Sequence, residues 1–152
     1  MILNKELTVQ RQETLRVVAL LAMLSITGCS GAVHGPVIEG NRRNGGTDAE
    51  VSGVVVIESD CLYLQMPGTD VRYPIVWPHG TLWNHQESAI ELSDGTLVYE
   101  GDEVRGAGGY HYLERLSEFT VTEGVELAVA CADNQYGEIA VFNSNDHIDT
   151  QR

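Results

Sequence analysis

Two tryptophans and two histidines lie within one short segment, Trp77-Pro78-His79-Gly80-Thr81-Leu82-Trp83-Asn84-His85. Indole rings can stack on flat ligands such as sugar rings, and imidazole nitrogens bind metal ions. A zinc site needs three or four ligands, so Glu87 or Asp94 would have to complete a pair of histidines. The spacing matches no metal motif, and we therefore assign no metal site and expect no cofactor. The candidate ligand-binding residues are Trp77, His79, Trp83, His85 and, if the fold brings it near, Tyr110.

A purely structural role explains the same segment. In that interpretation Trp77 ends a buried strand, Pro78-His79-Gly80 forms a turn, and Trp83 covers one end of the fold. The sequence leaves the two interpretations open.

Motifs that indicate catalysis are missing from the sequence. It contains no G-x-S-x-G, H-E-x-x-H or S-x-x-K pattern. Gly106-Ala107-Gly108-Gly109 lacks the G-x-G-x-x-G spacing of a nucleotide-binding loop. Glycines in a late strand instead mark a bulge or a close approach of two backbones. We therefore expect a protein that is not an enzyme and assign no catalytic residue.

A cysteine near the N-terminus ends a short apolar stretch. Lys5, Arg11 and Arg16 precede the apolar residues 17–27, and the stretch closes on Leu24-Ser25-Ile26-Thr27-Gly28-Cys29. A positive region followed by roughly 7–15 apolar residues is typical of a secretory signal, and it is shorter than the ~18–20 residues that span a bilayer. The motif resembles the lipobox of bacterial lipoprotein precursors, a family in which the cysteine is acylated and becomes the N-terminus.

This resemblance implies a signal peptide over residues 1–28 and a lipid anchor on Cys29. The lipid bilayer is then a partner of the chain, bound through the acylated cysteine. Ser30 resembles the residue that follows the lipidated cysteine in outer-membrane lipoproteins of Gram-negative bacteria. In a Gram-positive organism the same anchor implies the outer face of the plasma membrane. Either way, we expect the protein in the cell envelope.

The other two cysteines, Cys61 and Cys131, form an even pair. In an exported domain such a pair predicts a disulfide bond. Two reduced cysteines in the core are the alternative, since free cysteine is among the most buried residue types.

Acidic residues dominate the chain after the signal. Residues 29–152 retain six of the nine basic residues and 20 of the 22 acidic residues, a formal net charge of −14. Nucleic-acid binding requires Lys and Arg to neutralise phosphates, so we exclude it. The same net charge argues against direct adhesion of the chain to anionic headgroups, so the lipid must provide the anchoring. Solubility explains the acidity, and binding of cations or of a basic partner is the alternative.

Composition divides the mature chain into three parts. Residues 29–50 are rich in glycine and polar residues, as in a flexible tether. Residues 51–144 are long enough for one β-rich domain with its own core. The polar residues 145–152 predict a disordered tail.

Short apolar segments separated by turn residues predict a mainly β domain. The expected strands cover residues 54–57, 61–64, 72–77, 89–92, 96–99, 103–106 and 138–142, and Asp94-Gly95 is a strong hairpin signal. Residues 121–132 fit both helix and strand periodicity, and the capping-box pattern from Thr120 to Glu123 favours a short helix. We predict a small antiparallel barrel of the oligonucleotide/oligosaccharide-binding (OB-like) type with one short helix around 121–132.

The strand-turn-cysteine pattern, the Trp77-Pro78-His79-Gly80 loop and the Asp94-Gly95 hairpin are also similar to those of small uncharacterised bacterial lipoproteins of β-barrel type. That resemblance implies no known activity. The sequence thus predicts a membrane-anchored envelope lipoprotein with a small non-catalytic domain that binds an unknown envelope protein or glycan. The alternative is a metal- or carbohydrate-binding module that uses the Trp77–His85 loop.

Overall fold

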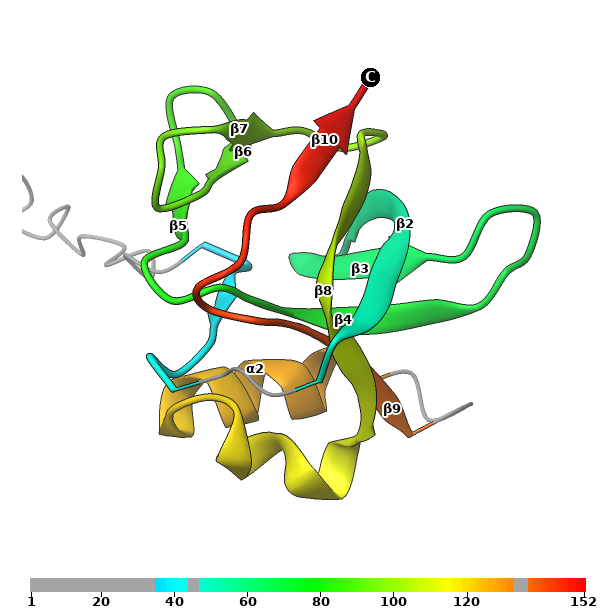
Figure 1. The fold of residues 1–152 in the computed structure, drawn as a ribbon, viewed down its shortest axis with the longest axis vertical. Coiled ribbons are helices and arrows are strands. Elements are labelled where there is room, and N and C mark those ends of the chain that lie inside the picture. The colour runs from blue at the N-terminus through cyan, green and yellow to red at the C-terminus, as the bar shows by residue number, and fades with distance from the viewer. Residues whose placement is uncertain (1–34, 44–46, 133–136) are drawn as a thin grey trace, which may run out of the picture. The chain divides into compact units, whose positions relative to one another are not determined.

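The computed structural model describes residues 35–43, 47–132 and 137–152 (Figure 1). The proposed signal peptide and Cys29 lie outside these residues. Five strands close into a barrel, in the spatial order β2, β3, β4, β9, β8 and back to β2. Their bounds are β2 Ala49–Glu58, β3 Cys61–Gln65, β4 Arg72–Trp77, β8 Glu103–Tyr112 and β9 Glu138–Phe142. The predicted class, a small mainly β barrel with one short helix, is confirmed.

The barrel is not antiparallel throughout. β4 and β9 run parallel, with Ile75 opposite Ala140, whereas every other pair in the barrel is antiparallel. A hairpin cannot join a parallel pair, and here the chain between β4 and β9 runs through a small sheet, β8 and two helical segments. The helix is therefore part of the connection that closes the barrel.

Side chains alternate between the inside and the outside of the barrel, as the two-residue period of a strand requires. The inward-facing residues form one buried cluster that includes Val51, Val55, Leu62, Leu64, Ile75, Trp77, Val104, Ala140 and Phe142. Glycine is needed where β8 approaches β9, because a Cβ built on Gly108 would lie 2.0 Å from the carbonyl oxygen of Val141. For Gly108, the interpretation as a point of close backbone approach is confirmed; a Cβ on Gly106 or Gly109 would meet side chains instead.

A second, three-stranded sheet covers one end of the barrel. It consists of β5 Leu82–Asn84, β6 Ala89–Glu91 and β7 Leu97–Val98, in that order. The predicted hairpin between β6 and β7 is present, and the Asp94 carboxylate accepts the amide of Thr96 at 2.9 Å within its turn. Ile90, Leu92 and Val98 join the core cluster of the barrel.

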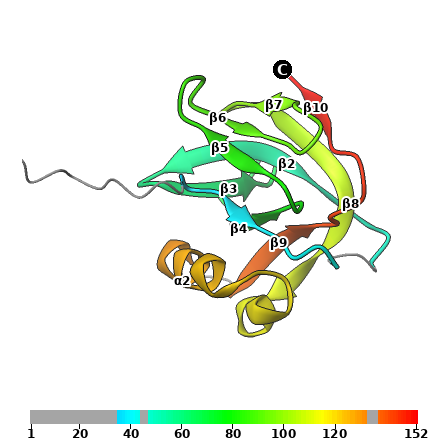
Figure 2. The same ribbon diagram turned by 90° about the vertical axis from the view of Figure 1, so that its left-hand side faces the viewer.

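A 3-10 helix, η1 (Leu113–Glu118), and the helix α2 (Thr122–Cys131) pack against the outside of the barrel. A second buried cluster holds them there, formed by Ile38, Val76, Leu116, Ala128, Ile139 and Val141. Figures 1 and 2 place α2 and the β5–β7 sheet on opposite sides of the barrel. The predicted helix is confirmed within one residue at each end.

The predicted capping box is wrong. Val121 is the N-cap of α2, and no side chain caps the helix. The hydroxyl of Thr120 instead donates to the backbone carbonyl of Glu39 at 2.5 Å, which links the start of the helix to the strand β1 (Ile38–Glu39). The Thr120 side chain therefore makes its hydrogen bond to a carbonyl distant in sequence and not to the backbone of its own helix.

The predicted disulfide is confirmed. Cys61 at the start of β3 and Cys131 at the end of α2 are joined with Cα atoms 5.6 Å apart. The bond fastens the far end of the helical connection to the barrel, and the hydroxyl of Tyr63 adds a hydrogen bond to the carbonyl of Cys131 at 2.9 Å.

Both predicted boundaries of the folded domain need correction. Within the expected tether, β1 (Ile38–Glu39) pairs in parallel with β4, and Ile38 is 1% exposed. Within the expected tail, β10 (Asp149–Gln151) pairs with β8, and Ile148 is buried. Composition missed both strands because each is two or three residues long, lies at a sheet edge and has few apolar residues in or beside it.

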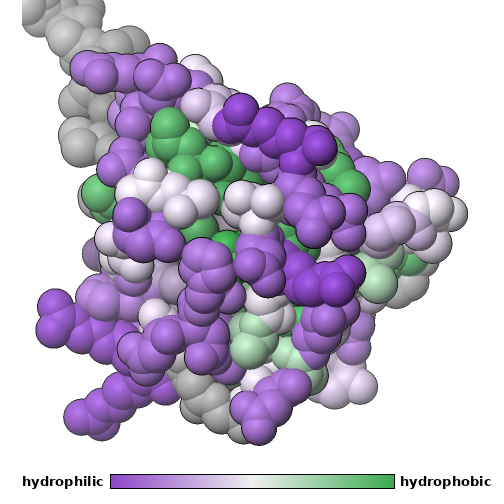
Figure 3. Space-filling view, turned by 45° about the horizontal axis from the view of Figure 1, so that its top comes forward, coloured by the Kyte–Doolittle hydropathy of each residue, from purple (hydrophilic) through white to green (hydrophobic). Residues whose placement is uncertain are grey.

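No helix in the described part of the chain is long and apolar enough to cross a membrane. Among the residues that the structure describes, the exposed large hydrophobic side chains are Leu82, Tyr112, Val121 and Val129. Figure 3 shows a face that is largely hydrophilic, with hydrophobic residues in separate small areas.

Candidate functional site

Trp77, the first candidate ligand-binding residue, belongs to the core. Its side chain is fully buried, and its ring stacks on Phe142 with the centroids 5.8 Å apart. The indole Nε1 has no hydrogen-bond partner among the described residues. A ring that is already covered by Phe142 offers no face to a sugar, so the structural interpretation holds for Trp77.

Trp83, on β5, is half-buried and packs against the same core. The backbone of Gly35 covers part of its ring, since a Cβ built on Gly35 would lie 2.1 Å from Cγ of Trp83. Only glycine fits between this segment and the indole. Trp83 thus connects the first described residues to the small sheet, as a residue that covers the end of the barrel does.

His85 and Tyr110 lie apart from the tryptophans. His85 is exposed in the turn after β5. Tyr110 lies toward the end of β8 and contacts Tyr73 near the start of β4, whereas Trp77 is the last residue of β4. Burial raises the pKa of the Tyr110 hydroxyl, which donates to the carbonyl of Ser52 at 3.4 Å. The five candidates therefore do not line one groove.

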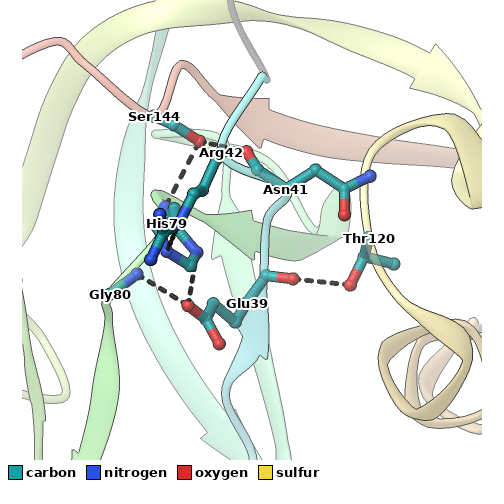
Figure 4. A network of polar contacts seen from close by, with 7 residues as sticks. All are labelled: Glu39, Asn41, Arg42, His79, Gly80, Thr120 and Ser144. Carbon is teal, nitrogen blue, oxygen red and sulfur yellow. Dashed lines mark hydrogen bonds and ion pairs between the residues drawn. The ribbon is translucent and has the colours of Figure 1, made fainter.

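His79 is the candidate that the fold places among other polar side chains (Figure 4). Its Nδ1 lies 2.7 Å from Oε1 of Glu39, on β1. Its Nε2 accepts a hydrogen bond from Nε of Arg42 at 2.8 Å. The same Oε1 of Glu39 accepts the amide of Gly80 at 2.7 Å. We call Glu39, Arg42 and His79 the His79 cluster.

This geometry fixes the orientation of the imidazole. Nε2 accepts a hydrogen bond from Nε of Arg42, and Nδ1 faces Oε1 of Glu39, so the two ring nitrogens have different partners. A carboxylate at one ring nitrogen is the usual way to set the tautomer and orientation of a functional histidine. In this protein the group that the oriented histidine contacts is a guanidinium.

Ser144 completes the surroundings without forming a catalytic relay. Its hydroxyl accepts the backbone amide of His79 at 3.3 Å and donates to the carbonyl of Asn41 at 2.6 Å. The contact is with the backbone of His79 and not with its ring, so no serine–histidine pair is set up. Groups of three or more His, Cys, Asp or Glu side chains that could hold a metal ion do not occur among the described residues.

Sequence reasoning found one of the three residues of the His79 cluster. Glu39 and Arg42 belong to residues 29–50, whose composition predicted a tether. The signal that could have found them is Val37-Ile38, an apolar pair just before Glu39, which is typical of a short strand.

The comparisons with known proteins give no match: no family model, no curated protein and no solved structure resembles this chain. Any function therefore has to be argued from its own residues.

Proposed function

We propose that the chain is a bacterial envelope lipoprotein, held in the bilayer by acyl chains on Cys29, with a barrel that binds another envelope component and performs no catalysis. The observation that carries the proposal is the sequence Leu24-Ser25-Ile26-Thr27-Gly28-Cys29 at the end of a short apolar stretch. The Cys61–Cys131 disulfide supports export, because such bonds persist in oxidising compartments.

A stable lipid anchor on Cys29 needs more than one acyl chain. One acyl chain gives only marginal membrane binding, at about 0.8 kcal/mol per buried methylene, so stable anchoring takes a second chain. A diacylglyceryl group on Cys29 meets that need without any membrane-spanning segment. The membrane is the outer one in a Gram-negative organism and the plasma membrane in a Gram-positive one.

The test is the intact mass of the chain, expressed in bacteria and extracted with mild detergent without reductant. We expect a product that begins at Cys29, carries the lipid, and weighs two hydrogens less than its reduced form. Cys29→Ala should remain an unprocessed precursor without lipid. The matched control, Cys61→Ser, should keep the lipid and lose the disulfide. A full-length, unmodified wild-type chain would refute the anchor.

The binding role is tested by site-specific photo-crosslinking in intact envelopes. A crosslinker at His85, exposed beside the small sheet, should give a discrete adduct with a protein or glycan if this end of the barrel makes the contact. The control position is Glu114, exposed on η1. Equal adducts at both positions, or none, would count against a binding surface here.

A further inference from the structure

The arginines of the described residues divide into two groups. Four form an ion pair with a carboxylate, in the pairs Arg72–Glu58, Arg105–Glu50, Arg115–Glu118 and Arg152–Asp102. Arg42 and Arg43 form none with a described carboxylate, although acidic residues dominate the chain. Both are exposed and adjacent in sequence. Two neighbouring guanidinium groups are thus left without a described counter-charge.

The position of Arg42 is fixed by its surroundings. Its Nε donates to His79, whose ring is in turn held by Glu39 (Figure 4). The residue before it, Asn41, is held through its carbonyl by Ser144 at 2.6 Å and through its amide by the carbonyl of Phe119 at 2.7 Å. A side chain fixed in this way loses little conformational entropy when it binds a ligand.

The contact with His79 uses one N–H donor of the Arg42 guanidinium and leaves the N–H donors on Nη1 and Nη2 for a ligand. Arginine has five N–H donors in a planar fork, and Nε–H is the one that His79 accepts. The Nη1–Nη2 edge matches two oxygens of a carboxylate or a phosphate. Glu39 is not that acceptor in the structure, since its Oε1 accepts from His79 and Gly80 on the other side of the ring.

We propose that Arg42 and Arg43 bind an oxyanion, a carboxylate or phosphate group, with Arg42 as the bidentate contact and His79 as its positioning residue. This deepens the proposed function by assigning a ligand chemistry to the barrel as a binding domain. The oxyanion site uses only residues of the folded domain, so its test is independent of whether Cys29 carries a lipid. A free anion and the phosphate of a lipid headgroup share this chemistry.

The experiment follows the arginine Nε–H signals of the full chain by NMR in neutral-detergent micelles. Three probes are titrated separately: inorganic phosphate, succinate, and lysophosphatidylglycerol mixed into the micelles. We expect the Arg42 Nε–H signal to shift and saturate, with affinity reduced about tenfold or more in Arg42→Gln. Arg43→Gln should weaken binding through the lost charge. The matched control is Arg105→Gln, which removes a guanidinium paired with Glu50 and should bind normally.

His79→Gln separates positioning from folding. It should weaken binding of the oxyanion and change the urea midpoint little more than Arg105→Gln does, because the two side chains are 37% and 57% exposed. Saturation by phosphate and succinate alone identifies a free anion as the ligand, and preference for the lysolipid identifies a headgroup. No saturable shift with any probe would overturn the site. Equal affinity in wild type and Arg42→Gln would do the same.

Discussion

The two buried threonines, Thr81 and Thr120, allow a paired test of the hydrogen-bond assignments. Thr81 is 1% exposed and Thr120 is 4% exposed. The Thr81 hydroxyl has no partner among the described residues, whereas the Thr120 hydroxyl donates to the carbonyl of Glu39. Valine has nearly the same shape as threonine and no hydroxyl. Threonine-to-valine substitution should therefore raise the unfolding free energy at one position and lower it at the other.

The magnitudes follow from the cost of an unpaired buried polar group, about 1–3 kcal/mol. Thr81→Val removes such a group and should raise the unfolding free energy by about 1 kcal/mol. Thr120→Val removes a hydrogen bond and leaves the Glu39 carbonyl without this donor, so it should lower the unfolding free energy by about 1–2 kcal/mol. The difference between the two variants is then roughly 2–3 kcal/mol.

Urea unfolding of the oxidised chain, followed by tryptophan fluorescence, measures both variants. Each should shift the midpoint and leave the slope unchanged, because the surface exposed on unfolding stays the same. If Thr81→Val destabilised the protein as much as Thr120→Val, the Thr81 hydroxyl would have a partner and the reasoning would be refuted.

Three further predictions concern the disulfide, one glycine and one histidine. Cys61→Ser should lower the unfolding free energy by about 4 kcal/mol, given a sequence separation of 70 residues, and an unchanged urea midpoint without reductant would contradict this. Gly108→Ala should lower the unfolding free energy by about 3 kcal/mol, because its Cβ would meet the carbonyl oxygen of Val141 at 2.0 Å. A decrease in unfolding free energy well below about 1 kcal/mol would show that β8 and β9 separate easily. Burial, together with the nearby Arg115, lowers the pKa of His111 from its ordinary value of 6.5. The unfolded chain then binds that proton more readily, so stability is full above pH 6.5 and is lost as the pH falls through the folded pKa. His111→Gln should flatten this part of the stability–pH curve, and an unchanged slope would assign the dependence to another group.

The sequence determined the elements whose signals are local. The strands at 54–57 and 61–64, the strand that ends at Trp77 and the Asp94-Gly95 turn were all predicted from apolar segments and turn residues, which act over a few positions. The disulfide followed from counting: with Cys29 assigned to the proposed lipid anchor, Cys61 and Cys131 are the remaining pair.

The tertiary structure decided what depends on partners distant in sequence. β1 exists because Ile38 has Val76 beside it, and β10 because β8 offers an open edge. Neither two-to-three-residue strand has a stable periodic signal of its own. The Thr120 hydroxyl bonds Glu39 and not its own helix, because the fold brings that carbonyl within reach.

The candidate site shows the same division. Sequence chemistry singled out His79 as a candidate ligand-binding residue, but it grouped His79 with two tryptophans that the core and Gly35 cover. Its partners Glu39 and Arg42 lie 40 and 37 residues away in the sequence. Residue types and local spacing are fixed by the chain alone. Contacts across such distances depend on the tertiary structure, here on the pairing of β1 with β4, which places Glu39 opposite Trp77 and close to His79.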